Sequence, residues 1–173
     1  KNTLMTQNVT LIPDYINSVD LFDFIINNCD FDRSMKARWT ASFGKSYDYN
    51  GMSYPAIPFP DNFTNILNSI NDTIGFHPNN CLINLYHDGK SSMGYHSDNT
   101  DILTPGTGVV IISLGSDRIL RFKNKLDGSI IVDYTLSNGS LFYMDDLVQS
   151  DWLHSIPKSD TMAPRISLTF RNI

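Results

Sequence analysis

The sequence predicts an α+β, mainly β fold: a sheet sandwich or squashed barrel buttressed by helices in its N-terminal part. Two stretches with helical spacing of apolar residues lie within residues 1–80, and short β-like runs separated by turn residues fill residues 81–173. A length of 173 residues and an apolar fraction of 41% suit a single core. We therefore expect residues 1–173 to form one domain.

The two predicted helices are marked by end signals as well as by spacing. The first follows Ser18, is rich in large apolar residues and ends near Asn28. The second begins near Pro60, repeats apolar residues every three or four positions and stops at Gly75. Residues 38–59 are rich in Tyr, Gly and Pro without a helical period, so we expect loops and short hairpins there, which usually carry recognition.

The C-terminal half is predicted to be all β. Its strands are expected over residues 82–86, 109–114, 119–122, 130–136, 141–144 and 166–170. Turn dipeptides separate several of these runs: Asp88-Gly89, Asp127-Gly128 and Asn138-Gly139. The chain contains no internal repeat, low-complexity tract or long linker, so a single meandering sheet structure is favoured.

The acidic balance and the few cysteines exclude some functions. A formal net charge of -5 and a pI near 5.1 argue against a protein that mainly coats nucleic acid or an anionic membrane, although a local basic groove is compatible with them. Cys29 and Cys81 are far apart in sequence, so we expect two core residues rather than a disulfide framework or a zinc site. No apolar run approaches the roughly 20 residues of a spanning helix, and no signal-peptide pattern is present. We therefore expect no membrane association and a cytoplasmic or nuclear location.

Three residues suggest a metal site. In His96-Ser97-Asp98, an imidazole and a carboxylate lie two positions apart, which places them on the same side of an extended chain. A second imidazole, His154, would complete an arrangement of two His and one carboxylate that suits Fe(II) and leaves coordination positions open for oxygen chemistry. His-x-Asp alone is a weak motif, and the alternative is a polar pair on a surface loop.

The last predicted strand strengthens the metal hypothesis. Residues 165–171 alternate strictly, with apolar side chains on one face and polar side chains, including Arg165 and Arg171, on the other. We expect the apolar face to pack against the helices and the polar face to line a cavity. Two inward-facing guanidinium groups need anionic partners, and a dicarboxylate would satisfy both. The alternative is an ordinary strand with one solvent-exposed face.

Together, the ordered motifs resemble a known family. Asn84-Leu85-Tyr86-His87-Asp88-Gly89, His96-Ser97-Asp98, His154 and the run 163–171 are similar to the AlkB family of nucleic-acid dealkylating dioxygenases. The resemblance covers roughly residues 38–172 and is most detailed with the animal AlkB homologues that repair alkylated DNA. It includes the segments 38–44 and 47–51.

This resemblance implies a double-stranded β-helix, a jelly-roll-like, cupin-type fold, with residues 1–80 supplying helices and nucleotide-recognition loops and residues 81–173 the catalytic β core. It implies Fe(II), 2-oxoglutarate and O2 as cofactors, with His96, Asp98 and His154 as the iron ligands. The residues implied to bind 2-oxoglutarate are Asn84, Tyr86, Arg165, Ser167 and Arg171. One arginine would pair with the distal carboxylate and the other would lie near the end that chelates iron.

The resemblance also implies substrate residues. Tyr49 is the candidate that stacks on the target base, Tyr47 is a candidate hydrogen-bond partner of that base, and Arg38 is a further candidate substrate residue. The alternative for both tyrosines is plain hairpin packing. A base reached in this way must be flipped out of a duplex or already unpaired. The residues that could line a phosphate path, or alternatively form a solvated face, are Arg33, Lys36, Arg38, Arg118, Arg121, Lys123 and Lys125.

Several positions depart from the family pattern. Thr100, followed by Asp101, stands where the family often has an acidic residue that contacts the base, and Ser167 stands where Asn is common. Residues 158–161 replace a basic loop that grips duplex DNA, and no aromatic wedge hairpin is found between residues 30 and 38. These differences and the acidic pI favour alkylated single-stranded RNA or DNA as the substrate of a monomeric enzyme. The alternatives are the same oxygenase chemistry on a protein or small molecule and, from another class, a β-barrel binding module without turnover.

Overall fold

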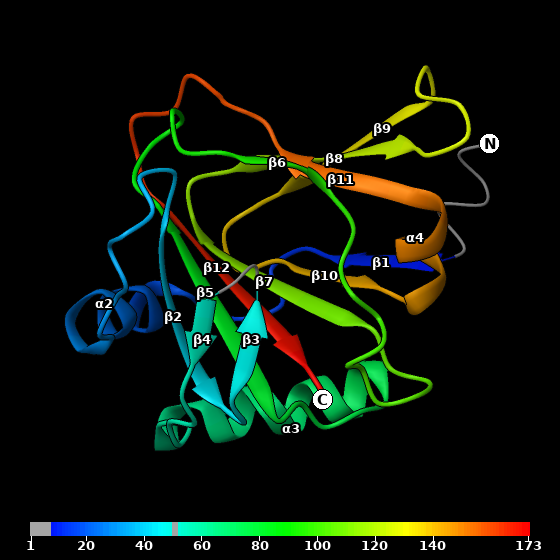
Figure 1. The fold of residues 1–173 in the computed structure, drawn as a ribbon. Coiled ribbons are helices and arrows are strands. Elements are labelled where there is room, and N and C mark those ends of the chain that lie inside the picture. The colour runs from blue at the N-terminus through cyan, green and yellow to red at the C-terminus, as the bar shows by residue number, and fades with distance from the viewer. Residues whose placement is uncertain (1–7, 50–51) are drawn as a thin grey trace.

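The strands form two main antiparallel sheets (Figure 1). The computed structural model describes residues 8–49 and 52–173. The six-stranded sheet has the order β1 (Val9–Ile12), β10 (Leu141–Met144), β7 (Val109–Gly115), β12 (Arg165–Arg171), β5 (Asn80–Tyr86) and β2 (Trp39–Gly44). The four-stranded sheet has the order β6 (Met93–His96), β11 (Trp152–Ile156), β8 (Arg118–Asn124) and β9 (Ile131–Leu136).

The path of the chain through these sheets is that of a jelly roll. From β5 onward the chain passes repeatedly from one sheet to the other: β5, β7, β10 and β12 lie in the larger sheet, and β6, β8, β9 and β11 in the smaller one. The last strand, β12, pairs with both β5 and β7. This arrangement confirms the predicted mainly β, double-stranded β-helix fold.

Both predicted helices are present. They are α2 (Val19–Asn28) and α3 (Thr64–Ile74), the second preceded by a single 3₁₀ turn, η1 (Asp61–Phe63). Gly75 ends α3 in the left-handed conformation, with φ of 101°. Leu21 and Ile25 of α2, and Leu67 and Ile70 of α3, belong to one buried cluster with the larger sheet. The helices therefore cover the face of that sheet away from the smaller sheet (Figure 1).

The alternation in β12 separates the two cores of the molecule. Ile166, Leu168 and Phe170 lie in the helix-facing cluster and are fully buried. A second apolar cluster, to which Tyr86 and Phe122 belong, involves both sheets. Since neighbouring side chains of a strand point to opposite faces, the polar residues of β12 face the space between the sheets. The prediction made for this strand is confirmed.

The prediction of only loops and short hairpins over residues 38–59 was wrong for β2. This six-residue strand pairs along its length with β5 at the edge of the larger sheet. Its sequence, Trp-Thr-Ala-Ser-Phe, alternates apolar and polar residues, which is a strand signal that its tyrosine- and glycine-rich surroundings obscure. The short hairpin itself is present as β3 (Tyr47–Tyr49) paired with β4 (Met52–Tyr54).

The prediction that the C-terminal half is all β was also wrong at one point. A six-residue helix, α4 (Asp146–Asp151), precedes β11. The Asp145 carboxylate caps it by accepting hydrogen bonds from the backbone N–H groups of Leu147 and Val148. A cap of this kind stabilises even a short helix, and here it places α4 beside the start of the strand that carries His154.

The N-terminal part of the chain contributes to the sheet as well as to the helical layer. Strand β1 pairs with β10, and β2 pairs with β5, so both edges of the larger sheet come from the first 80 residues. Residue 80 is therefore no boundary in the sheet. None of the described helices is both long enough and apolar enough to cross a membrane.

Candidate metal centre and cosubstrate pocket

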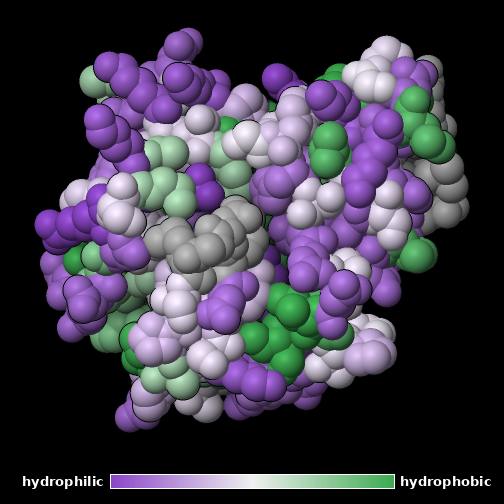
Figure 2. Space-filling model, in the orientation of Figure 1, coloured by the Kyte–Doolittle hydropathy of each residue, from purple (hydrophilic) through white to green (hydrophobic). Residues whose placement is uncertain are grey.

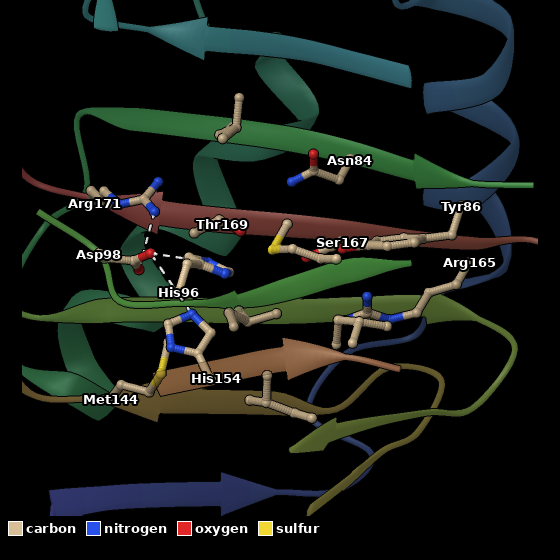
Figure 3. Close-up of a pocket in the computed structure, with 15 residues that line it drawn as sticks. Asn84, Tyr86, His96, Asp98, Met144, His154, Arg165, Ser167, Thr169 and Arg171 are labelled. Atoms are coloured by element: carbon tan, nitrogen blue, oxygen red, sulfur yellow. Dashed lines mark hydrogen bonds and ion pairs between the residues drawn. The ribbon is translucent and has the colours of Figure 1, made fainter. Parts of the chain in front are cut away.

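His96, Asp98 and His154 converge on one point between the sheets (Figure 3). Strands β6 and β11 are neighbours, and His96 and His154 are directly paired across them. Asp98 lies beyond the end of β6, and its Oδ1 is 3.6 Å from Nε2 of His96 and 3.8 Å from Nε2 of His154. One ligand atom from each residue lies within 4.8 Å of the others, so one metal ion can contact all three.

The orientation of His96 and the neutral state of His154 suit metal binding. Nδ1 of His96 lies 2.8 Å from the main-chain oxygen of Gly94. Because a carbonyl can only accept, Nδ1 donates to it, and Nε2 is the nitrogen that faces Asp98 and the metal position. Burial lowers the pKa of His154 to about 4, which keeps this imidazole neutral at pH 7, as metal binding requires.

Asp98 supplies the negative charge of the centre. Its side chain is only 5% exposed, and one oxygen is 3.3 Å from the guanidinium of Arg171. Burial acts to raise the pKa of the Asp98 carboxyl, but the interactions with His96 and Arg171 outweigh burial, so the pKa lies well below its ordinary value. The carboxylate is therefore anionic at neutral pH.

The inward face of β12 carries two buried arginines with unused donors. Arg165 is 1% exposed, and one of its terminal nitrogens donates to the hydroxyl of Ser113 at 3.0 Å. Its Nε and other terminal nitrogen, and one terminal nitrogen of Arg171, have no hydrogen-bond partner among the described residues. Buried guanidinium donors are costly when unpaired. They fit a bound anion with carboxylates at both ends.

A cavity joins the metal ligands to these arginines. Figure 3 shows Arg171 beside Asp98 and, further along the cavity, Arg165 beside Tyr86. The guanidinium of Arg165 lies 5.2 Å from the centre of the Tyr86 ring. The lining residues include every residue predicted to hold iron or 2-oxoglutarate: Asn84, Tyr86, His96, Asp98, His154, Arg165, Ser167 and Arg171. All of the residues predicted to hold iron or 2-oxoglutarate therefore surround one cavity. The individual role of each residue stays a prediction.

A sequence profile of the 2OG-Fe(II) oxygenase superfamily matches residues 27–171. The chain belongs to this superfamily. Fe(II) and 2-oxoglutarate are thus the cofactors that its donor set fits, with O2 as the oxidant. The match includes all three candidate metal ligands and both arginines.

The oxygenase is similar to AlkB-type proteins. It is 31% identical over 138 residues to human DNA oxidative demethylase ALKBH2, covering 75% of this chain and 53% of that protein. It is 33% identical over 115 residues to bovine alpha-ketoglutarate-dependent dioxygenase alkB homolog 3, covering 61% of this chain and 40% of that protein. Uncharacterized protein R406 of Acanthamoeba polyphaga mimivirus is 32% identical over 137 residues, with 78% and 71% covered.

The fold of the oxygenase also has a solved counterpart. The structure of OsALKBH1 superposes with a TM-score of 0.71 over 96% of this chain and 97% of that chain, at 17% identity. That likeness supports the double-stranded β-helix and nothing beyond it. The chain spans about half the length of human ALKBH2.

Arg38 of the oxygenase does not lie on a phosphate path. It is 8% exposed, and its Nε donates to the side-chain oxygen of Asn84 at 3.1 Å. Asn84 lines the cavity, and this contact fixes its amide so that the NH2 group is directed elsewhere. We therefore assign Arg38 to the wall behind the cosubstrate pocket, and its role in substrate binding stays a prediction.

Arg118 is a second correction. It is 2% exposed and donates to the main-chain oxygens of Asp88, Ser91 and Pro157. It thereby ties the loop after β5 to the loop after β11, so it is unable to reach a nucleic-acid backbone. Sequence reasoning missed this role because no local pattern distinguishes a buried arginine from an exposed one.

The other candidate basic residues lie nearer the surface. Arg121 is ion-paired with Asp133 at 2.8 Å, and the ammonium of Lys123 lies 4.2 Å from the Tyr95 ring. The ammonium of Lys125 donates to a main-chain oxygen of α4. Arg33, stacked on a tryptophan, and Lys36 are exposed. These five residues stay candidates for contact with phosphate.

Of the two candidate tyrosines, the structure describes the side chain of Tyr47 but not that of Tyr49. Tyr47 is 5% exposed, and the guanidinium of Arg171 lies 5.3 Å from the centre of its ring. It therefore forms part of the wall beside the metal centre. The side chain of Tyr49 lies outside the described part of the molecule, although its backbone is paired with Met52 in the hairpin. Its stacking role stays a prediction.

Proposed function

We propose that the protein is an Fe(II)- and 2-oxoglutarate-dependent dioxygenase that demethylates N-alkylated bases, of the 1-methyladenine and 3-methylcytosine type, in single-stranded RNA or DNA. The observation that carries this proposal is a His-Asp-His centre that shares one cavity with buried, unpaired guanidinium donors. Bound iron would supply oxidation of the N-methyl group coupled to decarboxylation of 2-oxoglutarate, releasing formaldehyde, succinate and CO2.

Each residue of the cavity has a task in this proposal. His96, Asp98 and His154 would hold the metal, and the neutral state of His154 leaves a lone pair for it. Arg165 binds the distal carboxylate of 2-oxoglutarate through its unpaired donors, and Arg171 lies beside the metal end. The residues that complete the cosubstrate site are Asn84, Tyr86 and Ser167.

The apolar part of the cavity wall supports oxidative chemistry. Met93, Leu120, Met144 and Ile156 line it beside the metal ligands. An apolar wall limits the entry of water, which would otherwise compete with the substrate for the oxidant and for the open coordination positions.

The substrate part of the proposal starts from the relatives. One is named as a DNA oxidative demethylase, and this chain retains the hairpin segment in which Tyr49 is the candidate stacker. The face shown in Figure 2 is mixed around this hairpin region, where hydrophilic residues lie next to an apolar patch. Asp101 lies exposed in the loop after Asp98, where it could contact a base in place of the family acid.

The preference for single strands rests on missing duplex contacts. Residues 158–161 hold one cation, Lys158, and one anion, Asp160, so the loop has no net charge. Between residues 30 and 38 the aromatic residue is Phe31, which packs against the buried core rather than projecting as a wedge. We also propose that the chain acts as a monomeric domain in the cytoplasm or nucleus, where its free thiols, Cys29 and Cys81, stay reduced.

The proposal is tested by incubating the protein with Fe(II), 2-oxoglutarate and single-stranded oligonucleotides that carry 1-methyladenine or 3-methylcytosine. We expect formaldehyde and succinate from the methylated oligonucleotides and no formaldehyde from unmethylated ones. Asp98→Ala, which removes the anionic ligand, is the inactive control. Succinate without formaldehyde from any oligonucleotide would favour a protein or small-molecule substrate, and no succinate under any condition would favour a binding module.

A further inference from the structure

One iron ligand is not held by the sheet. His96 and His154 belong to paired strands, but Asp98 follows the end of β6, in a stretch without regular structure. Its backbone N–H donates instead to the side-chain oxygen of Gln149 at 2.7 Å. Gln149 lies on α4, so this helix, about fifty residues later in the chain, fixes the position of the loop.

Gln149 is itself held firmly. Gln149 is only 3% exposed. Its NH2 group lies 3.7 Å from the sulfur of Met144, a residue that lines the cavity. The main-chain oxygen of Gln149 accepts a hydrogen bond from Lys125 at 2.8 Å. Because a backbone N–H can only donate, the amide oxygen must face Asp98 and the NH2 group must face Met144.

Asp98 has a second buried contact, through its side chain. Arg171 approaches one carboxylate oxygen to 3.3 Å, so the Asp98 side chain is attracted by a buried guanidinium as well as facing the two histidines. The hydrogen bond from the Asp98 backbone to Gln149 anchors the main chain, so the other carboxylate oxygen stays 3.6 and 3.8 Å from the two imidazoles.

We propose that Gln149 is a positioning residue that fixes Asp98 for metal binding, and that α4 thereby holds one ligand of the iron site in place. This role rests on the proposed metal site. Removing the acceptor frees the Asp98 backbone, and outer partners of metal ligands typically contribute about 10- to 100-fold in metal affinity. The loss should appear in metal binding itself and should not depend on turnover.

The test is a Mn(II) titration of the metal-free protein, followed by electron paramagnetic resonance. Gln149→Met keeps the length of the side chain but removes the acceptor, and we expect its Mn(II) dissociation constant to rise about 10- to 100-fold. Gln149→Glu keeps an acceptor oxygen and should stay close to the native protein. Ser150→Ala, at the exposed neighbour on the same helix, is the matched control and should bind Mn(II) as the native protein does.

The outcomes separate a positioning role from a structural one. A merely structural glutamine would lower the melting temperature of the metal-free protein and leave the Mn(II) dissociation constant unchanged. Native affinity in Gln149→Met, or an equal loss in Gln149→Glu, overturns the proposal. Should Gln149→Met fail to fold, Gln149→Asn, which withdraws the amide by one methylene, carries the same test. If the native protein does not bind Mn(II), the metal site itself fails.

Discussion

At the scale of single residues, burial decides what each charge can do. Arg165 and Arg38 are both buried, but two donor nitrogens of Arg165 have no hydrogen-bond partner among the described residues, whereas the Nε of Arg38 donates to Asn84. Unpaired donors that line a cavity, as those of Arg165 do, indicate a place for an anion. Cavity lining is needed as well as pairing, because the Nε of Arg118 is also buried without a partner but Arg118 does not line the cavity.

Replacing Arg165 should weaken cosubstrate binding. Arg165→Met keeps much of the side-chain volume and removes every donor, so we expect the concentration of 2-oxoglutarate at half-maximal succinate formation to rise about 10- to 100-fold. Arg121→Met, at a half-exposed position on the four-stranded sheet, is the control and should leave this concentration unchanged. Unaltered 2-oxoglutarate dependence in Arg165→Met would return Arg165 to a structural role.

The buried imidazole of His154 should make the metal-free protein sensitive to acid. Its pKa is lowered from 6.5 to about 4 by burial, so between these values the unfolded chain binds a proton that the folded chain does not. Stability is then fully present above pH 6.5 and is lost as the pH falls toward 4.

This pH dependence is measured as the melting temperature of the metal-free protein at a series of pH values. The melting temperature should fall through that window, and His154→Gln, which has no titrating imidazole, should show a shallower fall. Identical slopes in the two proteins would contradict the assignment.

At the scale of elements, β12 combines two functions on its two faces. Leu168 is fully buried in the helix-facing cluster, while its neighbour Ser167 lines the cavity. Strand pairing on both sides, with β5 and β7, fixes which face is which. A slip of one residue would exchange the two sets of side chains, so the register of this strand is strongly specified.

Substitutions on the two faces of β12 should therefore separate stability from cosubstrate binding. Leu168→Ala should lower the free energy of unfolding by about 2 to 5 kcal/mol through lost burial and a residual cavity. Ser167→Ala should change stability little and raise the 2-oxoglutarate requirement. Chemical denaturation and a 2-oxoglutarate titration of both variants provide the comparison, and an equal stability loss in both would contradict the division.

At the scale of the whole molecule, the balance of charge bears on the proposed preference for single strands. The formal net charge is -5, and the structure withdraws Arg38 and Arg118 from the candidates for phosphate contact. The basic residues that remain candidates for phosphate contact carry few positive charges. They therefore provide little of the long-range attraction with which a protein binds a nucleic-acid duplex. Flipping a paired base costs a few kcal/mol, which a single strand largely avoids.

We therefore expect faster demethylation of single-stranded oligonucleotides than of the same sequences annealed to their complements. The measurement is formaldehyde release from matched substrates carrying 1-methyladenine or 3-methylcytosine, at low and at high salt. Equal or faster turnover of the duplex would overturn the preference without affecting the assignment of the oxygenase site.

The sequence alone determined the parts of this protein that follow from local periodicity and ordered motifs. Alternation over residues 165–171 fixed which side chains point inward, because a strand has a period of two whatever surrounds it. The metal and cosubstrate chemistry was predicted from the residue types and their order along the chain. Few kinds of site need two histidines, one aspartate and two arginines in this order, and here these are His96, Asp98, His154, Arg165 and Arg171.

The tertiary structure alone decided the features that depend on distant strands. Three features arise from contacts between segments that lie far apart in the chain. They are the position of β2 at a sheet edge, the burial of Arg38 and Arg118, and the hydrogen bond between Gln149 and Asp98. A propensity or a spacing carries no information about such neighbours, since the same arginine or glutamine is exposed or buried according to which loop packs over it.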